Sequence, residues 1–150
     1  MPRRELKHPQ QIIDWLQEWG AVLPASSALT LIGSGGLLWH AAQRGVVEPL
    51  PENSMDVDPV TDDEAVARLG YDAMIGSEFE LTHGWHVNLM PKAVLLELPA
   101  GWAQRVSRSQ YGSLTVLVPA PADLLAPKLR RGEPRDLKHA AWAHQVGLLP

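Results

Sequence analysis

The feature that most constrains the fold is a run of glycines directly after a short apolar segment. Residues 28–32 (ALTLI) are apolar and β-prone, which predicts a buried strand, and Gly33-Ser34-Gly35-Gly36 follows at once. Residues 37–42 then carry apolar side chains at helical spacing, up to Gly45. The glycines therefore occupy a strand-to-helix turn, and the chain must combine strands with helices.

Strand and helix patterns continue along the rest of the chain. Pro9 at a first helical position and Gly20 as a terminator predict a helix over residues 9–19. Alternating and helical apolar patterns predict strands over 55–58, 85–90, 104–108 and 113–118, and helices over 62–69, 122–126 and 134–146. The chain of 150 residues suits one domain of α/β (α+β) class, a sheet covered by helices, with its core over about 28–146.

Prolines and a capping pattern set several of these boundaries. Pro59 cannot donate to a sheet ladder, so we expect the second strand to end there or to lie at an edge. Thr61 and Glu64 have the spacing of a capping box. Pro127 is expected to interrupt or bend the helix that starts near residue 122, and Pro134 to begin the last helix.

Charge and cysteine usage exclude several function classes. The net charge is −4, so there is no global basic field for non-specific binding of nucleic acid. The absence of cysteine excludes disulfides, thiolate zinc sites and cysteine nucleophiles. No apolar run approaches the roughly 20 residues that span a bilayer, so we expect no membrane partner and a cytoplasmic protein.

The glycine turn has two interpretations. Backbone N–H groups after such a turn can point at an anion, helped by the positive end of the following helix, and Ser34 adds a hydroxyl donor. Alternatively, the glycines serve only tight packing. The turn matches neither the phosphate loop that ends in Gly-Lys-Ser/Thr nor the spaced dinucleotide fingerprint.

Two acidic residues on the second predicted strand form the next candidate feature. Asp56 and Asp58 are two residues apart, so their side chains share one face of the strand. Paired carboxylates can hold one or two Mg²⁺ ions, as two-metal phosphoryl transfer requires. The alternative is a pair of solvent-facing acids on an edge strand.

A basic segment near the end of the chain is the third feature. Lys128 can neutralise phosphate charge as a compact cation, and Asp136, which follows Arg135, can orient it or act as a base. Such a run also describes an ordinary cluster of ion pairs on a helix surface.

Together these motifs resemble the polymerase-β-like nucleotidyltransferase superfamily. The glycine turn followed by Asp56-x-Asp58 resembles its turn and acidic strand. The tail, with Lys128-Leu129 and Arg135-Asp136-Leu137, is similar to its bacterial branch, which includes the abortive-infection toxins of type IV toxin–antitoxin systems. The resemblance covers roughly residues 28–146.

The resemblance implies a nucleotidyltransferase fold with a mixed central sheet flanked by helices. It also implies an NTP substrate, Mg²⁺ or Mn²⁺ as cofactor, and transfer of a nucleotidyl group to a hydroxyl of RNA, a protein or a small molecule. The phosphate contacts would be Gly33, Ser34 and Gly35, with Lys128 touching the nucleotide. The metal ligands would be Asp56 and Asp58, and Asp136 would be the base or orienting acid. We expect the turn and the acid pair to lie side by side.

The sequence departs from the family pattern at several positions. Where many active members carry a third carboxylate on a later strand, this chain has Asn88, although Glu97 lies further on. The later acid after Arg-Asp is His139 here. These departures motivate an alternative: a degenerate, non-catalytic domain that binds nucleotide or a cognate protein partner in a toxin–antitoxin or regulatory pair.

Overall fold

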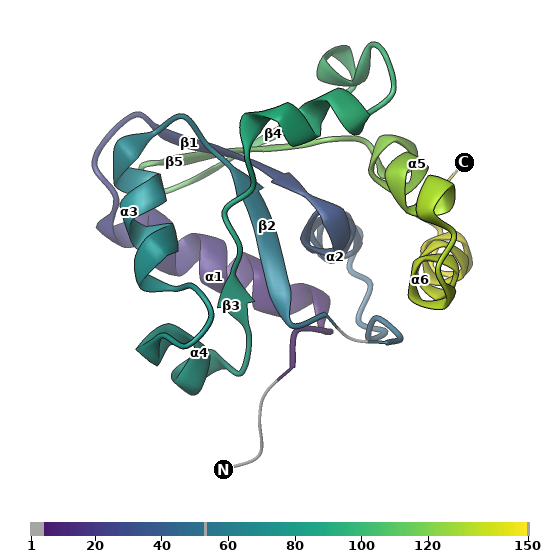
Figure 1. Ribbon diagram of the computed structural model, residues 1–150, viewed down its shortest axis with the longest axis horizontal. Helices are drawn as coiled ribbons and strands as arrows, with labels where there is room; N and C mark the ends of the chain where they lie inside the picture. Colours follow the sequence, from purple (N-terminus) through teal and green to yellow (C-terminus); the bar gives the residue numbers. More distant parts are fainter. Residues whose placement is uncertain (1–4, 53, 150) are drawn as a thin grey trace.

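The computed structural model describes residues 5–52 and 54–149, and it builds them around one five-stranded sheet (Figure 1). The strands are β1 (Ser27–Ile32), β2 (Asp56–Val60), β3 (His86–Val87), β4 (Ser107–Tyr111) and β5 (Leu114–Val118). Their order is β3-β2-β1-β5-β4. The pairs β1–β5 and β2–β3 are parallel, whereas β1–β2 and β4–β5 are antiparallel. The expected mixed sheet of an α/β (α+β) chain is confirmed.

Six α-helices accompany the sheet within the described residues. They are α1 (Pro9–Val22), α2 (Gly33–Gln43), α3 (Glu64–Asp72), α4 (Glu78–His83), α5 (Pro121–Arg131) and α6 (Pro134–Gln145), with short 3-10 segments η1 (Lys92–Glu97) and η2 (Trp102–Gln104). In Figure 1, α5 and α6 lie together at the side of the sheet where β1 and β5 end. No helix among the residues described combines the length and the apolar character needed to cross a bilayer.

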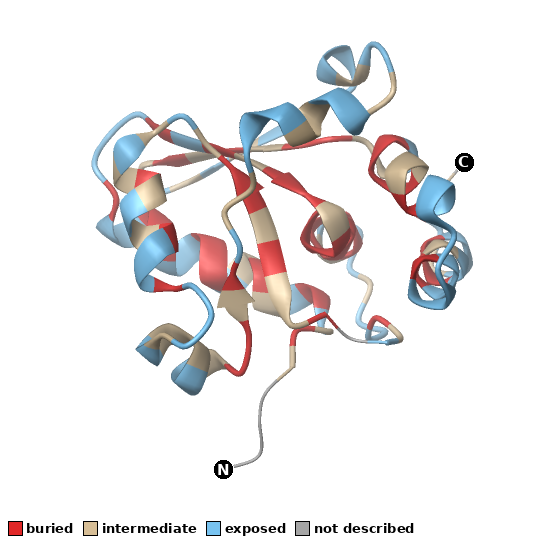
Figure 2. Cartoon of the chain, in the orientation of Figure 1, coloured by how far each residue is buried: buried red, intermediate tan, exposed pale blue. Residues whose placement is uncertain are grey.

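The core lies between one face of the sheet and the helices α1 and α2. A Cβ placed on Gly35 of α2 would lie 3.3 Å from Leu31 of β1, 3.4 Å from Val57 of β2 and 3.6 Å from Ile12 of α1. Four elements therefore meet at this glycine, and Figure 2 shows α2 as mostly buried. Because Val57 faces this core, strand alternation turns Asp56 and Asp58 toward the opposite face of the sheet.

Two expected element ends are wrong because tertiary contacts override the local signal. α1 continues through Gly20 to Val22, and the glycine lets β4 approach: a Cβ there would lie 1.9 Å from the Tyr111 carbonyl oxygen. β2 continues through Pro59 to Val60 and lies between β1 and β3, not at an edge. The Pro59 carbonyl accepts from the Met90 N–H, so the backbone of Pro59 faces residues 88–90 and not β1. The N–H that proline lacks therefore removes no hydrogen bond between β2 and β1.

Two helices, α3 and α5, also differ from the expected boundaries. The N-cap of α3 is Asp63, which accepts from the Ala65 N–H, whereas Thr61 donates its hydroxyl to Ala28 O. α5 is not interrupted at Pro127 but continues to Arg131. The last helix begins at Pro134 as expected.

Candidate functional site

A cleft of about 410 Å³ lies where β1 ends, β2 begins, and α5 and α6 stand beside the sheet. Its lining comes from both halves of the chain, including the start of α2, the start of β2 and the facing sides of α5 and α6. Six of the seven site residues expected from the sequence line it: Gly33, Ser34, Asp56, Asp58, Lys128 and Asp136. The seventh, Gly35, is buried in the core behind the cleft and is not part of its lining.

The acid pair faces this cleft and lies beside the start of α2. A Cβ built on Gly33 would lie only 2.9 Å from Asp58 Oδ2, so the turn and the acid pair are immediate neighbours, as expected. Asp58 Oδ1 accepts from the Asn88 amide at 3.1 Å, and Ser54 Oγ donates to Asp56 Oδ1 at 3.2 Å. β2 is an inner strand, so these carboxylates are not solvent-facing acids on an edge strand.

The electrostatics of the acid pair favour a bound cation. Burial, and then repulsion from Asp56, raises the pKa of the Asp58 carboxyl from 3.8 to about 6. The Asn88 hydrogen bond and the more distant cations Lys128 and Arg131 oppose this rise in pKa without cancelling it. The pair therefore concentrates negative charge that the protein neutralises only in part.

The glycine segment forms the first turn of α2 and not a separate turn before it. The helix begins at Gly33, whose φ of +68° suits glycine, and neither a side-chain cap nor an acidic residue occupies its N-terminus. Gly36 meets a packing demand, since a Cβ there would lie 2.8 Å from a Leu124 methyl carbon. Packing accounts for Gly35 and Gly36, whereas Gly33 and Ser34 face the cleft.

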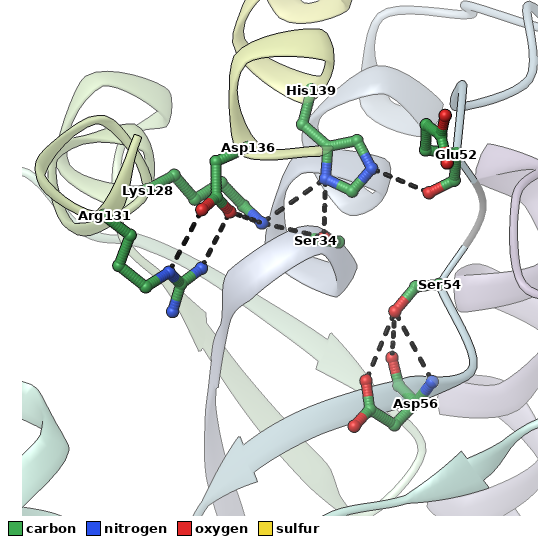
Figure 3. Close-up of polar contacts among 8 residues, drawn as sticks. All are labelled: Ser34, Glu52, Ser54, Asp56, Lys128, Arg131, Asp136 and His139. Carbon is green, nitrogen blue, oxygen red and sulfur yellow. Dashed lines mark hydrogen bonds and ion pairs between the residues drawn. The ribbon is translucent and has the colours of Figure 1, made fainter. Parts of the chain in front are cut away.

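The wall opposite the acids is cationic and comes from α5 and α6 (Figure 3). Lys128 is 4% exposed, and its Nζ lies 3.0 Å from Ser34 Oγ and 3.9 Å from Asp136 Oδ1. Burial lowers the pKa of Lys128 to about 8, although Asp136 opposes the shift. Arg131 donates to both oxygens of Asp136, at 2.9 and 3.3 Å.

Asp136 is consequently an ionised carboxylate held by two cations. The hydrogen bond from Arg131 holds the pKa of Asp136 below its ordinary value. A carboxylate in this state is a weak proton acceptor, so the geometry favours the orienting role over the role of a base.

Three further polar residues belong to the site but were not among its expected residues, although Arg135 and His139 lie in or just after the Arg-Asp motif. Ser54 lies two residues before Asp56, so strand periodicity places it beside the acids. His139 lies three residues after Asp136, on the same side of α6, and contacts both Ser34 and Lys128. Arg135 lines the cleft, is exposed, and forms no ion pair with any described residue.

The donors present fit a divalent cation that is shared with a substrate. Among residues 5–52 and 54–149, no group of three or more His, Cys, Asp or Glu side chains converges on one point. Mg²⁺ is often held by only one or two carboxylates, with water and substrate phosphates completing the shell. Asp56 and Asp58 supply that pair, and a cation between them would offset the burial and the repulsion from Asp56 that raise the pKa of Asp58.

Comparison with known proteins gives no family for this chain. No protein-family model, no curated protein and no solved structure matches it. Its function must therefore be inferred from the cleft itself, whose two carboxylates face a cationic wall across the start of a helix.

Proposed function

We propose that this chain is a metal-dependent nucleotidyltransferase with a nucleotidyltransferase fold. It transfers a nucleotidyl group from an NTP to a hydroxyl of RNA, a protein or a small molecule. One observation carries the proposal: a single cleft combines Asp56 and Asp58, the uncapped N-terminus of α2, and the cations Lys128 and Arg135. A metal-bound polyphosphate needs this combination of acidic, dipolar and basic groups.

The roles of the residues follow from their positions. Asp56 and Asp58 would hold Mg²⁺ or Mn²⁺, and the chemistry such an ion would supply is charge neutralisation at the phosphate oxygens. Backbone N–H groups at Gly33 and Ser34 donate hydrogen bonds to phosphate oxygens at the positive end of α2. Lys128 and Arg135 stabilise negative charge on the departing phosphates.

The reaction is an in-line displacement at the α-phosphorus. The acceptor hydroxyl oxygen forms a bond to this phosphorus and its proton passes to solvent water. The bond from phosphorus to the bridging oxygen breaks, and pyrophosphate leaves. Asp136 remains ionised and orients Lys128 and Arg131, so it keeps the cationic wall in place.

A second candidate function is a degenerate domain that binds nucleotide, or a cognate protein partner, without turnover. The observation that favours it is Asn88, whose amide donates to Asp58 at a place where a third carboxylate would complete the metal site. A role in a toxin–antitoxin or regulatory pair would need only binding.

Calorimetry with each of the four NTPs, with and without Mg²⁺, tests the binding step. Asp56→Asn combined with Asp58→Asn should abolish Mg²⁺-dependent NTP binding, because no carboxylate pair remains. Asp62→Asn is the matched control, since Asp62 is exposed, pairs with Lys92 and lies outside the cleft. Unchanged affinity in the double variant would refute the metal site.

Transfer of a labelled NMP separates the two candidate functions. The wild-type protein is incubated with α-labelled NTP, Mg²⁺ or Mn²⁺, and tRNA, and labelling of the RNA and of the protein itself is measured. Label that depends on Asp56 and Asp58 supports catalysis. Binding without label in any acceptor supports the degenerate domain.

A further inference from the structure

A fully buried imidazole lies behind the cationic wall and has no part in the proposed reaction. His139 is 0% exposed and lies on α6, one helical turn after Asp136. Figure 3 shows the two sides of its ring directed at different partners. Nδ1 lies 3.1 Å from Ser34 Oγ and 3.4 Å from Lys128 Nζ, and Nε2 lies 3.0 Å from the Glu52 carbonyl oxygen.

The partners of the ring determine where its proton lies. A backbone carbonyl can only accept, so Nε2 carries a proton and donates it to Glu52. Burial lowers the pKa of His139, and the nearby Lys128 and Arg135 lower it further, although the carbonyls of Glu52 and Pro51 oppose them. The ring is therefore neutral, and Nδ1 presents a lone pair.

The lone pair on Nδ1 fixes the direction of the remaining hydrogen bonds. The Lys128 ammonium has donors only, so Ser34 Oγ must accept from it. The Ser34 hydroxyl proton then points to Nδ1. The result is one directed chain of donors that runs from Lys128 to Ser34, to His139 and to Glu52.

We propose that His139 is a positioning residue that, through the Nδ1 acceptor, holds Ser34 and Lys128 in the one arrangement that presents the ammonium to phosphate in the cleft. The lysine side chain has a flexible four-carbon stem and can adopt several conformations. A fixed acceptor behind Ser34 orients the Ser34 hydroxyl, and this favours the one lysine conformation whose ammonium donates to it. The statement about phosphate rests on the proposed function, whereas the hydrogen-bond chain itself does not.

Two substitutions separate the two sides of the ring. In His139→Asn the side-chain amide reaches about as far as Nδ1, so its oxygen can accept from Ser34, but it cannot reach Glu52. In His139→Gln the amide reaches about as far as Nε2 and can donate to Glu52, but it leaves no acceptor beside Ser34. The Asn variant keeps the contact that we assign to positioning, and the Gln variant keeps the contact to the loop.

The first measurement uses the protein without nucleotide. Nitrogen-15 NMR of the wild-type histidine ring should show Nδ1 unprotonated and Nε2 protonated near neutral pH. The Lys128 Nζ resonance should remain close to its wild-type shift in His139→Asn and should move or broaden in His139→Gln. A protonated Nδ1 in the wild type, or a Lys128 resonance unchanged in the Gln variant, would overturn the proposal.

The second measurement is the affinity for MgATP by calorimetry, with thermal unfolding as the check on folding. We expect His139→Gln to weaken binding about tenfold and His139→Asn to stay within about threefold of the wild type. Equal weakening in both variants would mean a merely structural histidine. If the wild type binds no nucleotide, the proposed function fails, and the ring and lysine resonances still test the role of His139. If a variant does not fold, the protonation of the wild-type ring still tests it, since a protonated Nδ1 would overturn the proposal.

Discussion

At the scale of single residues, Gly33 meets two requirements, one from the backbone conformation and one from the neighbouring acid of the site. Its φ of +68° lies in the left-handed region, where a side chain costs about 1–2 kcal/mol. The space for a side chain is also taken, because a Cβ would lie 2.9 Å from Asp58 Oδ2. The residue is therefore needed both for the entry into α2 and for the position of the acid.

We expect Gly33→Ala to lower the free energy of unfolding by about 1–2 kcal/mol and also to weaken Mn²⁺ or Mg²⁺-NTP binding. Gly45→Ala is the matched control, since its φ is +71° and nothing lies within 4 Å of its Cβ position. Gly45→Ala should lower the free energy of unfolding by a similar amount and leave binding unchanged. Chemical denaturation and calorimetry on both variants check this, and equal loss of binding in both would contradict it.

Strand periodicity predicts that Asp56 and Asp58 share one face of their strand, and both line the cleft. Their position beside Gly33 was expected from the sequence pattern together with the resemblance, and Asp58 does lie next to Gly33. The inward position of Gly35 was not predictable, because a glycine run looks the same whether it serves phosphate or packing. His139 was also missed, since a single histidine does not reveal that its helix will stand against Ser34.

At the scale of elements, the strands and helices were largely predictable, whereas several of their ends were not. Periodic apolar patterns located every strand and most helices, although α4 was not foreseen. The local rules predict that Gly20 ends a helix and that Pro127 interrupts or bends one, but α1 and α5 continue past them. In the case of Gly20, the reason is the backbone of Tyr111, which comes from a distant part of the chain and is invisible to local rules.

One ion pair anchors residues 99–105, which follow the cleft-lining residues Glu97 and Leu98, to α5. Arg105 donates to both oxygens of Asp123, at 2.8 and 2.9 Å, and also to Ala100 O. Asp123 is 4% exposed, so without the guanidinium it would be a buried carboxylate without its cation. Glu97 and Leu98, just before this segment, line the cleft, so the ion pair holds the chain next to that wall against α5.

We expect Arg105→Ala to make amide hydrogen exchange in residues 99–105 about tenfold faster and to lower the melting temperature. Arg105→Lys should rescue only part of this loss, because a lysine cannot form the bidentate pair. Arg108→Ala is the control, since Arg108 is exposed on β4 and forms no ion pair with a described residue. Exchange by mass spectrometry that is equal in the Arg105 and Arg108 variants would show that the ion pair does not anchor the segment.

At the scale of the whole molecule, the cleft is divided by charge, and the division follows the chain. The acid pair Asp56 and Asp58 comes from β2, whereas the cations come from α5 and α6, where Asp136 is paired with Arg131. The hydrogen bond from Lys128 to Ser34 joins residues 94 positions apart. The net charge of −4 hides this local polarity. Each half of the cleft therefore repels one component of a metal–triphosphate pair and attracts the other.

This polarity predicts that metal and nucleotide stabilise the fold together more than the sum of their separate effects. Triphosphate alone meets the repulsion of Asp56 and Asp58, and Mg²⁺ alone finds only two carboxylates, whereas the complex satisfies both halves. At about 100 times its Kd the complex should add about 2.7 kcal/mol of stability, which raises the melting temperature of a domain of this size by roughly 5–10 °C.

Thermal shifts with Mg²⁺, with a non-hydrolysable ATP analogue, and with both measure the synergy. It should vanish in the Asp56→Asn, Asp58→Asn protein and persist in Asp62→Asn, and purely additive shifts in the wild type would mean that the two halves do not share one ligand.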